Sequence, residues 1–300
     1  SKIKITNSEI GDLEGGGIIV YGGVCDNLIP SGNLIDNNYI HDFERTYETY
    51  KPGIRLMNSV GAVVSHNEIG NATHSAIIFG QAEEDRSGRA IDNIIEYNYI
   101  HDVIEYPDSG AVYGGRTYAD RGNIIRYNYF AHIGAAGWTI YLDDGLSGQT
   151  VHGNIFYEAG SYSIFHSGGR DNTITDNITI AEYGISPLRI WAKYAEQIAD
   201  GGVEALSPWT WPTYYESYKL IPAEGTEGRK KWEERWPELF DMIADLSLSS
   251  DRLTDRNFIA NSAGSIFKNN LSFFERDLKD HTISSEYALK FNTFEDNPIY

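Results

Sequence analysis

The chain of 300 residues is poor in cysteine, in basic residues and in long apolar runs. Its single cysteine, Cys25, excludes an internal disulfide and a metal cage built from cysteines. Only 24 Lys and Arg residues stand against 43 Asp and Glu residues, which gives a formal net charge of −19. This charge argues against nucleic acid as a partner, because phosphate binding depends on Lys and Arg. No apolar run approaches the ~18–20 residues of a membrane span, so we expect no membrane partner either.

Sequence motifs for cofactors are also missing. The chain has no Walker loop, dinucleotide-binding glycine pattern, metal-binding histidine pair or calcium loop, so we expect no cofactor and no bound metal. No signal peptide is visible, and Ser1 begins within a strand-like pattern. We therefore expect a mature or excised segment. The sequence carries no signal for a particular oligomeric state.

A short phrase, an Asn followed by an apolar anchor, repeats along the first half of the chain. The anchors are spaced 30, 29, 31, 30 and 26 residues apart, at Ile10, Ile40, Ile69, Ile100, Phe130 and Phe156. Each period also contains a short run of β-branched and aromatic residues, such as 110–113 and 138–141, bounded by Gly, Asn or Asp. Such runs predict strands, and strands that recur at one coil length without helices between them predict a stacked solenoid.

We therefore predict an all-β fold, a right-handed parallel β-helix with a mainly helical insertion. The repeated Asn residues are expected to tolerate left-handed backbone at turns and to form an amide ladder between coils. The coil pattern fills 1–183 and returns in 253–300, first through Asn257 to Asn261.

The segment 184–252 differs from the coils and is predicted to be a helical, aromatic-rich insertion. It lacks Asn and holds five of the six Trp residues of the chain. Ser186-Pro187 predicts a helix start, Gly201-Gly202 a stop, and Pro237 the start of a further helix after 228–236. Insertions of this kind often line the binding face of a solenoid.

Two adjacent carboxylates are the strongest candidates for chemistry. When the strand phrases are aligned on Tyr113, Tyr141 and Phe165, Asp143 falls between Gly115 and Ser167 on neighbouring coils, and Asp144 falls beside Arg116. Successive coils lie about 4.8 Å apart, so Arg116 is expected to contact Asp144. Adjacent carboxylates near an arginine can divide into acid and base roles. Asp143-Asp144-Gly145 is equally a turn sequence.

Further residues could complete a site around this pair. We expect His166 to orient a substrate or a carboxylate, Arg170 to line the cleft, and Glu83 and Glu84 to face it from two coils below. Sugar rings stack on aromatic planes, so tryptophans are candidate binding residues for an oligo- or polysaccharide. They are Trp138 in the coils and Trp209 and Trp211 in the insertion.

Several phrases occur in an order that resembles a known family. They are 108–116, 121–130, 141–145 and 168–172 in the coils, and 232–239 in the insertion. Together they resemble the right-handed parallel β-helix enzymes of bacterial carbohydrate metabolism, most of all glycoside hydrolase family 141, over roughly residues 90–260. The resemblance implies a glycosidase with two catalytic Asp residues and an extracellular or periplasmic location.

Carried onto this chain, the catalytic pair implied by the resemblance is Asp108 with Asp143 or Asp144. Asp108 falls in register with Ala136, seven residues before Asp143. Seven residues of straight strand span about 23 Å, whereas glycosidic hydrolysis needs carboxylates ~5–9.5 Å apart. Asp108 can join the pair only if the chain bends sharply.

Two other functions remain open from the sequence. A polysaccharide lyase on the same fold would use Arg116 or Arg170 as its base, often with calcium bound to the uronate, although the negative net charge disfavours a polyanionic substrate. A non-catalytic solenoid would bind carbohydrate or serve as a structural stack. Our first expectation remains a glycosidase that cleaves a neutral plant- or host-type glycan, with Asp143 or Asp144 as base or nucleophile and a second carboxylate as acid.

Overall fold

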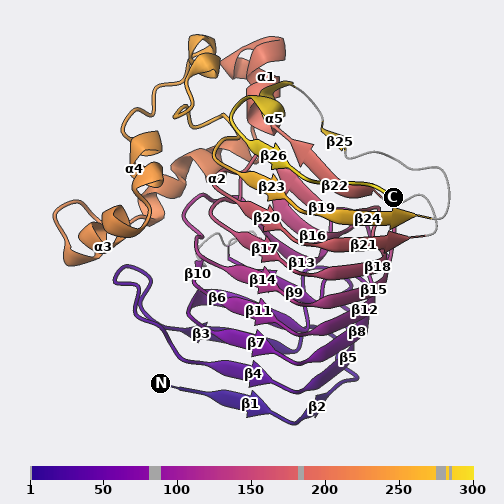
Figure 1. Ribbon diagram of the computed structural model, residues 1–300. Helices are drawn as coiled ribbons and strands as arrows, with labels where there is room; N and C mark the ends of the chain where they lie inside the picture. The colour runs from indigo at the N-terminus through magenta and orange to yellow at the C-terminus, as the bar shows by residue number, and fades with distance from the viewer. Residues whose placement is uncertain (1, 81–88, 182–185, 275–281, 284–285) are drawn as a thin grey trace.

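The computed structural model describes residues 2–80, 89–181, 186–274, 282–283 and 286–300. Successive turns of the chain stack on one another and build three sheets, A, B and C, in which every strand pair is parallel. Figure 1 shows the stack rising from β1 at the N-terminus to β26 near the C-terminus. The predicted stack of parallel β-strands is therefore confirmed, and the arrangement is consistent with a parallel β-helix.

Most coils contribute one short strand to each sheet; the coil from β7 to β10 gives two to sheet C, and no strand of sheet B follows β24 in the described residues. Sheet A contains β1 (Lys4–Thr6), β4 (Leu34–Asp36), β7 (Val63–Ser65), β11 (Ile94–Glu96), β14 (Ile124–Arg126), β17 (Thr150–His152), β20 (Thr173–Thr175), β23 (Ile266–Lys268) and β26 (Thr293–Glu295). Sheet B contains β2 (Glu9–Ile10), β5 (Tyr39–Phe43), β8 (Glu68–Ala72), β12 (Tyr99–Val103), β15 (Tyr129–Ile133), β18 (Ile155–Ala159), β21 (Ile178–Ala181) and β24 (Leu271–Phe274). Sheet C contains β3 (Ile18–Gly22), β6 (Ile54–Val60), β9 (Ile77–Phe79), β10 (Ala90–Ile91), β13 (Gly110–Gly115), β16 (Trp138–Asp143), β19 (Tyr162–Ser167), β22 (Ser186–Trp191) and β25 (Thr282–Ile283).

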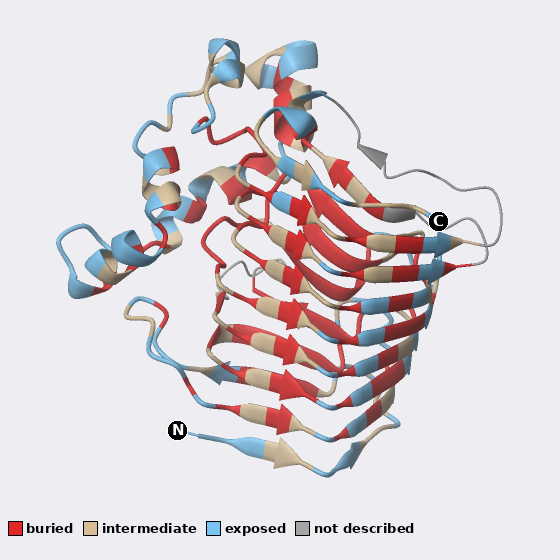
Figure 2. Ribbon diagram, in the orientation of Figure 1, coloured by how far each residue is buried: buried red, intermediate tan, exposed pale blue. Residues whose placement is uncertain are grey.

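The apolar anchors of the sequence repeat stack directly on one another in sheet B. The pairing runs from Ile10 through Ile40, Ile69 and Ile100 to Phe130 and Phe156. Ile40 to Phe156 are fully buried, and the rings of Phe130 and Phe156 stack at 5.2 Å. Figure 2 shows buried residues recurring on successive strands of the stack. The repeat spacing thus predicted the strand register correctly.

A ladder of asparagine amides joins the coils beside this band. The Nδ2 of Asn98 donates to Oδ1 of Asn128 at 2.9 Å and to the carbonyl of Val64 at 3.0 Å, and its Oδ1 accepts from Asn67. Left-handed backbone occurs one residue before the ladder amide, at Tyr97 for example, rather than at the Asn itself as the sequence suggested. The amide ladder is confirmed, and the left-handed backbone conformation is adopted by the residue before each ladder Asn.

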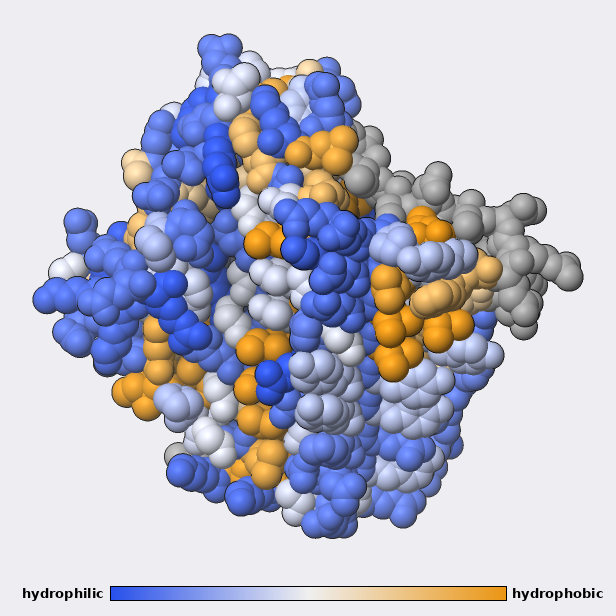
Figure 3. Space-filling model, viewed as in Figure 1, coloured by the Kyte–Doolittle hydropathy of each residue, from blue (hydrophilic) through white to orange (hydrophobic). Residues whose placement is uncertain are grey.

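The outer face of sheet B remains open to solvent at its later coils. Ile155, Ile180 and Phe273 are each about 40% exposed. In Figure 3 hydrophobic colour gathers in this region, over β18, β21 and β24.

The excursion from the solenoid begins later than the sequence indicated. Residues 186–191 form strand β22 of sheet C, so the helix start predicted at Ser186-Pro187 is wrong; strand pairing with β19 overrides the local proline signal.

The excursion occupies 192–265, between β22 and β23, and Asn257 to Asn261 belong to it rather than to a coil strand. Its elements are α1 (Lys193–Gly201), η1 (Val203–Ala205), α2 (Trp211–Tyr215), η2 (Glu216–Leu220), α3 (Glu227–Arg235), α4 (Pro237–Ile243) and η3 (Ser250–Thr254). The predicted stop at Gly201 and the helix start at Pro237 are correct, and a final helix, α5 (Glu286–Lys290), lies in the last coil.

The excursion packs along one side of the stack (Figure 1, upper left) and shares a second apolar core with it. Trp232 is fully buried in this core and donates its indole N–H to the carbonyl of Cys25. The guanidinium of Arg121, also fully buried, donates to Asp171 in the solenoid and to Glu238 in α4, each at 2.7 Å. Within the described residues, no helix is both long enough and apolar enough to cross a membrane.

Candidate active site

An aromatic column on the outer face of sheet C forms the base of the site. Tyr113, Tyr141 and Phe165 are paired in register on successive strands, and their rings stack at 5.0 and 5.1 Å. Trp138 packs against this column, with its ring 4.3 Å from that of Tyr141. The alignment drawn from the sequence placed all three stacked residues correctly.

Asp143 and Asp144 lie where strand β16 ends, beside this column. Gly115 is the partner of Asp143 on the neighbouring strand, and a Cβ at Gly115 would come within 2.9 Å of the Asp143 Cβ. The absence of a side chain there leaves room for the carboxylate. Arg116 Nε lies 3.9 Å from Asp143 Oδ2 and 3.7 Å from Asp144 Oδ2, so one guanidinium serves both carboxylates, as expected.

The turn predicted from the same residues is present as well. The amide of Leu146 donates to the carbonyl of Asp143 at 3.0 Å, and both Asp144 and Gly145 have left-handed backbone, with φ of 39° and 83°. A Cβ on Gly145 would lie 2.5 Å from the ring of Tyr214, so this turn requires glycine. The tight turn fixes where the two carboxylates point.

Lys193 is a member of the site that the sequence analysis missed. It is the first residue of α1, and its ammonium donates a hydrogen bond to Asp144 Oδ1. Asp144 is therefore held between two cations, Lys193 and Arg116. Strand register could have revealed this contact, because Trp191 pairs with Ser167 on β19 and so extends the alignment to the next coil.

Asp143 lies deeper than Asp144 and is protonated more easily than an ordinary aspartate. The hydroxyl of Tyr113 donates to Asp143 Oδ2 at 2.9 Å, and that of Tyr141 also interacts with this carboxylate. Burial and the neighbouring negative charge of Asp144 raise the pKa of Asp143 to about 7, against the lowering effect of Tyr141 and Arg116. A carboxyl that retains its proton near neutral pH can act as a proton donor.

Asp108 belongs to the same electrostatic environment despite its distance along the chain. It has left-handed backbone, with φ of 57°, in the loop before β13, where the hydroxyl of Ser109 donates to the carbonyl of Tyr106 at 2.8 Å. Desolvation by the surrounding protein and the charge of Asp144 raise the pKa of Asp108, while Arg116 lowers it. The residue is nonetheless exposed to solvent.

His166 lies inside the coil stack, away from these carboxylates. It pairs in register with Leu142 and Ile190, whose side chains fill the solenoid core. Its ring packs edge-on against Phe267, and its Nε2 lies 3.4 Å from the hydroxyl of Ser265. Burial lowers the pKa of His166 to about 4, so the ring is neutral. The alignment placed His166 on the right strand, but the alternation of strand side chains turns it inward.

Arg170 holds the excursion to the solenoid, whereas Trp211 packs within the excursion. Arg170 donates through both Nη atoms to the backbone carbonyls of Arg256, Phe258 and Asn261. Trp211 is buried against Tyr194, with ring centroids 4.8 Å apart. Both side chains therefore have packing roles here.

The remaining tryptophan in the prediction, Trp209, is 82% exposed on the excursion. Glu83 and Glu84, the two glutamates expected to face the cleft, lie outside the described residues.

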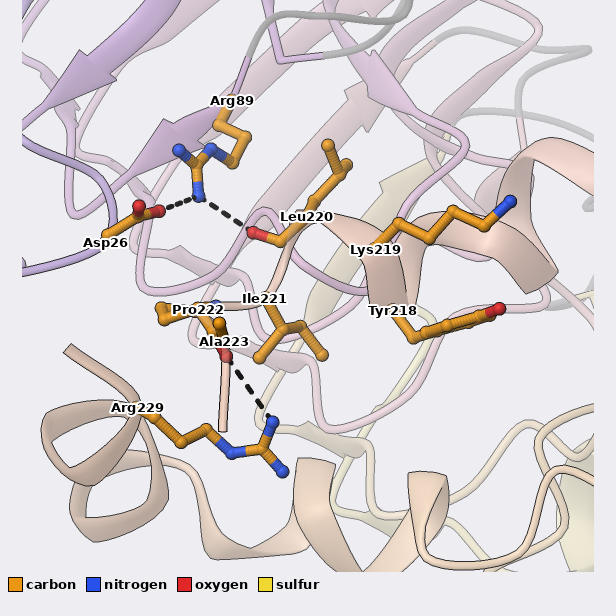
Figure 4. Close-up of a pocket in the computed structure, with 9 residues that line it drawn as sticks. All are labelled: Asp26, Arg89, Tyr218, Lys219, Leu220, Ile221, Pro222, Ala223 and Arg229. Carbon is orange, nitrogen blue, oxygen red and sulfur yellow. Dashed lines mark hydrogen bonds and ion pairs between the residues drawn. The ribbon is translucent and has the colours of Figure 1, made fainter. Parts of the chain in front are cut away.

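A separate hollow of about 660 Å³ lies where the excursion meets the first coils. Figure 4 shows that Arg89 points to Asp26 and to the carbonyl of Leu220, and that Arg229 points to the carbonyl of Pro222. Lys219, at the same hollow, pairs with Glu216 at 3.0 Å. The cations here already have partners, so the hollow is a junction between excursion and solenoid rather than a second charged site.

Comparison of the chain with protein-family models, with curated proteins and with solved structures finds no match. The site is therefore interpreted from its own geometry.

Proposed function

We propose that this protein is a glycoside hydrolase that uses the carboxylates at the end of β16. The observation that carries the proposal is the grouping of Asp143 and Asp144 with Arg116 and Lys193 beside the aromatic column of sheet C, with Asp108 in the same electrostatic environment. Asp143 and Asp144 each lie within 4 Å of the Arg116 Nε, so one cation faces both buried carboxylates. The resemblance to glycoside hydrolase family 141, with its right-handed coil, points to the same chemistry.

The environments of the three carboxylates assign them different roles. Asp108 faces solvent and has a raised pKa, so it is placed to protonate the glycosidic oxygen. Asp144, held between two cations, acts as the base or nucleophile. Asp143 lies behind it and sets the local charge, because its proton is lost only near pH 7. Pairs of carboxyls in contrasting environments divide acid and base roles in this way.

The test is a comparison of two leaving groups in two variants. Asp144→Asn should abolish turnover of natural glycosidic linkages and of dinitrophenyl glycosides alike. Asp108→Asn should lose natural linkages but retain dinitrophenyl glycosides, because that leaving group departs without protonation. Asp176→Asn, the same change at a remote turn, is the control. Wild-type turnover by Asp144→Asn would refute the proposal.

The products separate the alternatives. Unsaturated, ultraviolet-absorbing ends would indicate a polysaccharide lyase, and binding without new reducing ends a non-catalytic solenoid. Arg116 contacts two carboxylates and Arg170 donates to three carbonyls, so neither offers a free base. The geometry favours hydrolysis.

A further inference from the structure

Arg189 is an arginine without an acidic partner on the same face as the carboxylates. It occupies the position next to Phe165 in the aromatic column of sheet C. Within the described part of the chain it forms no ion pair, and its Nε, which is shielded from solvent, has no hydrogen-bond partner. In a chain with 43 acidic residues and only 24 basic ones, an unpaired arginine needs an explanation.

Three aromatic rings surround the Arg189 guanidinium. Its Cζ lies 5.0 Å from the ring centre of Phe165, 5.2 Å from that of Tyr162 and 5.9 Å from that of Trp191. These distances are typical of cation–π contacts, and aromatic packing orients a guanidinium without using its N–H donors. The arginine is thus positioned and still able to bind a ligand.

Trp191 connects this arginine to the carboxylates. Its indole N–H donates to Glu196 at 2.7 Å, which fixes the orientation of the ring. The ammonium of Lys193, which binds Asp144, lies 5.5 Å from the centre of the same ring. Arg189 and Lys193 therefore both lie over one indole, which places the arginine beside the carboxylate site.

We propose that Arg189, with Trp191, Tyr162 and Phe165, forms a subsite for a sugar that carries a carboxylate. The inference rests on the proposed glycosidase function and specifies its substrate class as a glycan that contains a uronic acid beside the cleaved residue. A planar carboxylate matches the two parallel N–H donors of a guanidinium, while the partly exposed aromatic rings contact the sugar. One arginine binds one uronic acid of the substrate. A protein with a net charge of −19 can accommodate a substrate with this single negative charge.

The experiment measures binding by calorimetry on the full chain with matched ligands. Glucuronate-substituted xylotetraose is compared with xylotetraose, and tetragalacturonate with its carboxyl-reduced form. We expect the acidic member of at least one pair to bind about tenfold to a hundredfold more tightly. Arg189→Gln should abolish this preference, and Arg189→Lys should retain only part of it.

A matched control and a separate readout keep the outcomes distinct. Arg126→Gln removes another arginine that lies over a tyrosine, 5.7 Å from Tyr127, but that arginine already pairs with Glu96. It should leave the preference unchanged, and thermal melting of each variant checks the fold. Equal binding of acidic and neutral ligands, a preference that survives in Arg189→Gln, or selective binding of sulfated xylotetraose would each overturn the proposal. If the preference is found but chromatography shows no cleavage, the glycosidase function fails and the subsite stands.

Discussion

The ammonium of Lys193 donates a hydrogen bond to the carboxylate of Asp144, and this contact joins the excursion to the solenoid. Asp144 directly follows strand β16 of the solenoid, whereas Lys193 is the first residue of helix α1. The side chain of Asp144 is 3% exposed and that of Lys193 15% exposed, so the ion pair is largely shielded from water. The excursion thereby contributes directly to the electrostatics of the site.

Removing the lysine should destabilise the fold as well as the site. Lys193→Met leaves the buried Asp144 with Arg116 alone, and the loss of one partner from a buried ion pair costs about 3–5 kcal/mol. Urea unfolding at pH 7 measures this loss. Lys219→Met, which breaks the exposed pair with Glu216, should cost little, because both side chains are solvated. Equal effects of the two substitutions would contradict a special role for Lys193.

The sequence predicted the coil register because that register depends on a periodic pattern. Ile40, Ile69 and Ile100 recur at one spacing, and burial of every anchor admits only one alignment. The contact between Arg116 and Asp144 followed from this alignment, since both residues lie on regular coils.

Other parts of the site depend on contacts that no period encodes. Lys193 was missed because Pro187 can start a strand as well as a helix, and only pairing with β19 decides between them. Asp108 lies in an irregular loop with left-handed backbone before β13, where the charge of Asp144 affects its pKa. His166 shows the converse: its strand was predicted correctly, but its burial among core residues is a property of the folded stack.

The hydroxyl of Tyr113 should lower the pKa of Asp143. It donates to Asp143 Oδ2 at 2.9 Å, and a hydrogen bond to a carboxylate favours the charged form. In Tyr113→Phe we expect the pKa of Asp143 to rise further, by about 0.5–1 unit. Carboxyl ¹³C NMR of aspartate-labelled protein follows the titration. Tyr129→Phe, in an exposed tyrosine column, is the control and should leave the titration of Asp143 in place.

Arg121 should be the strongest single tether of the excursion. Its fully buried guanidinium pairs with Asp171 and Glu238 and also donates to the carbonyl of Tyr118 at 3.0 Å. Arg121→Met strands both acidic groups, so we expect a loss of about 3–5 kcal/mol in the free energy of unfolding. Arg229→Met, which removes a more exposed pair with Glu233 within α3, should cost about 0.5 kcal/mol. Proteolysis within 192–265 should accelerate only in the Arg121 variant.

Glu44 should make stability depend on pH in an unusual direction. Its carboxylate is fully buried and accepts hydrogen bonds from the backbone amides of Lys51, His74 and Ser75. Burial nonetheless raises the pKa of Glu44 to about 7 from 4.5. Between these values the folded protein binds more protons than the unfolded chain, so this contribution is complete below pH 4.5 and is lost as the pH rises through 7.

Glu44→Gln removes this titration. Relative to wild type, the variant should therefore have a higher free energy of unfolding at alkaline pH than at acidic pH. Gln can accept with only one of its two terminal atoms, so we expect a constant loss from the unmatched amides at every pH. On top of this loss, the stability difference between variant and wild type should shift by about 2–3 kcal/mol in favour of the variant between pH 5 and pH 8. His74, whose pKa burial lowers to about 4, adds an opposite slope below pH 6.5, which cancels because both proteins contain it. Urea unfolding at the two pH values measures the shift, and Glu48→Gln gives the baseline for losing a carboxylate from the same loop. A difference that is independent of pH would show that Glu44 is ionised throughout this range in the folded protein.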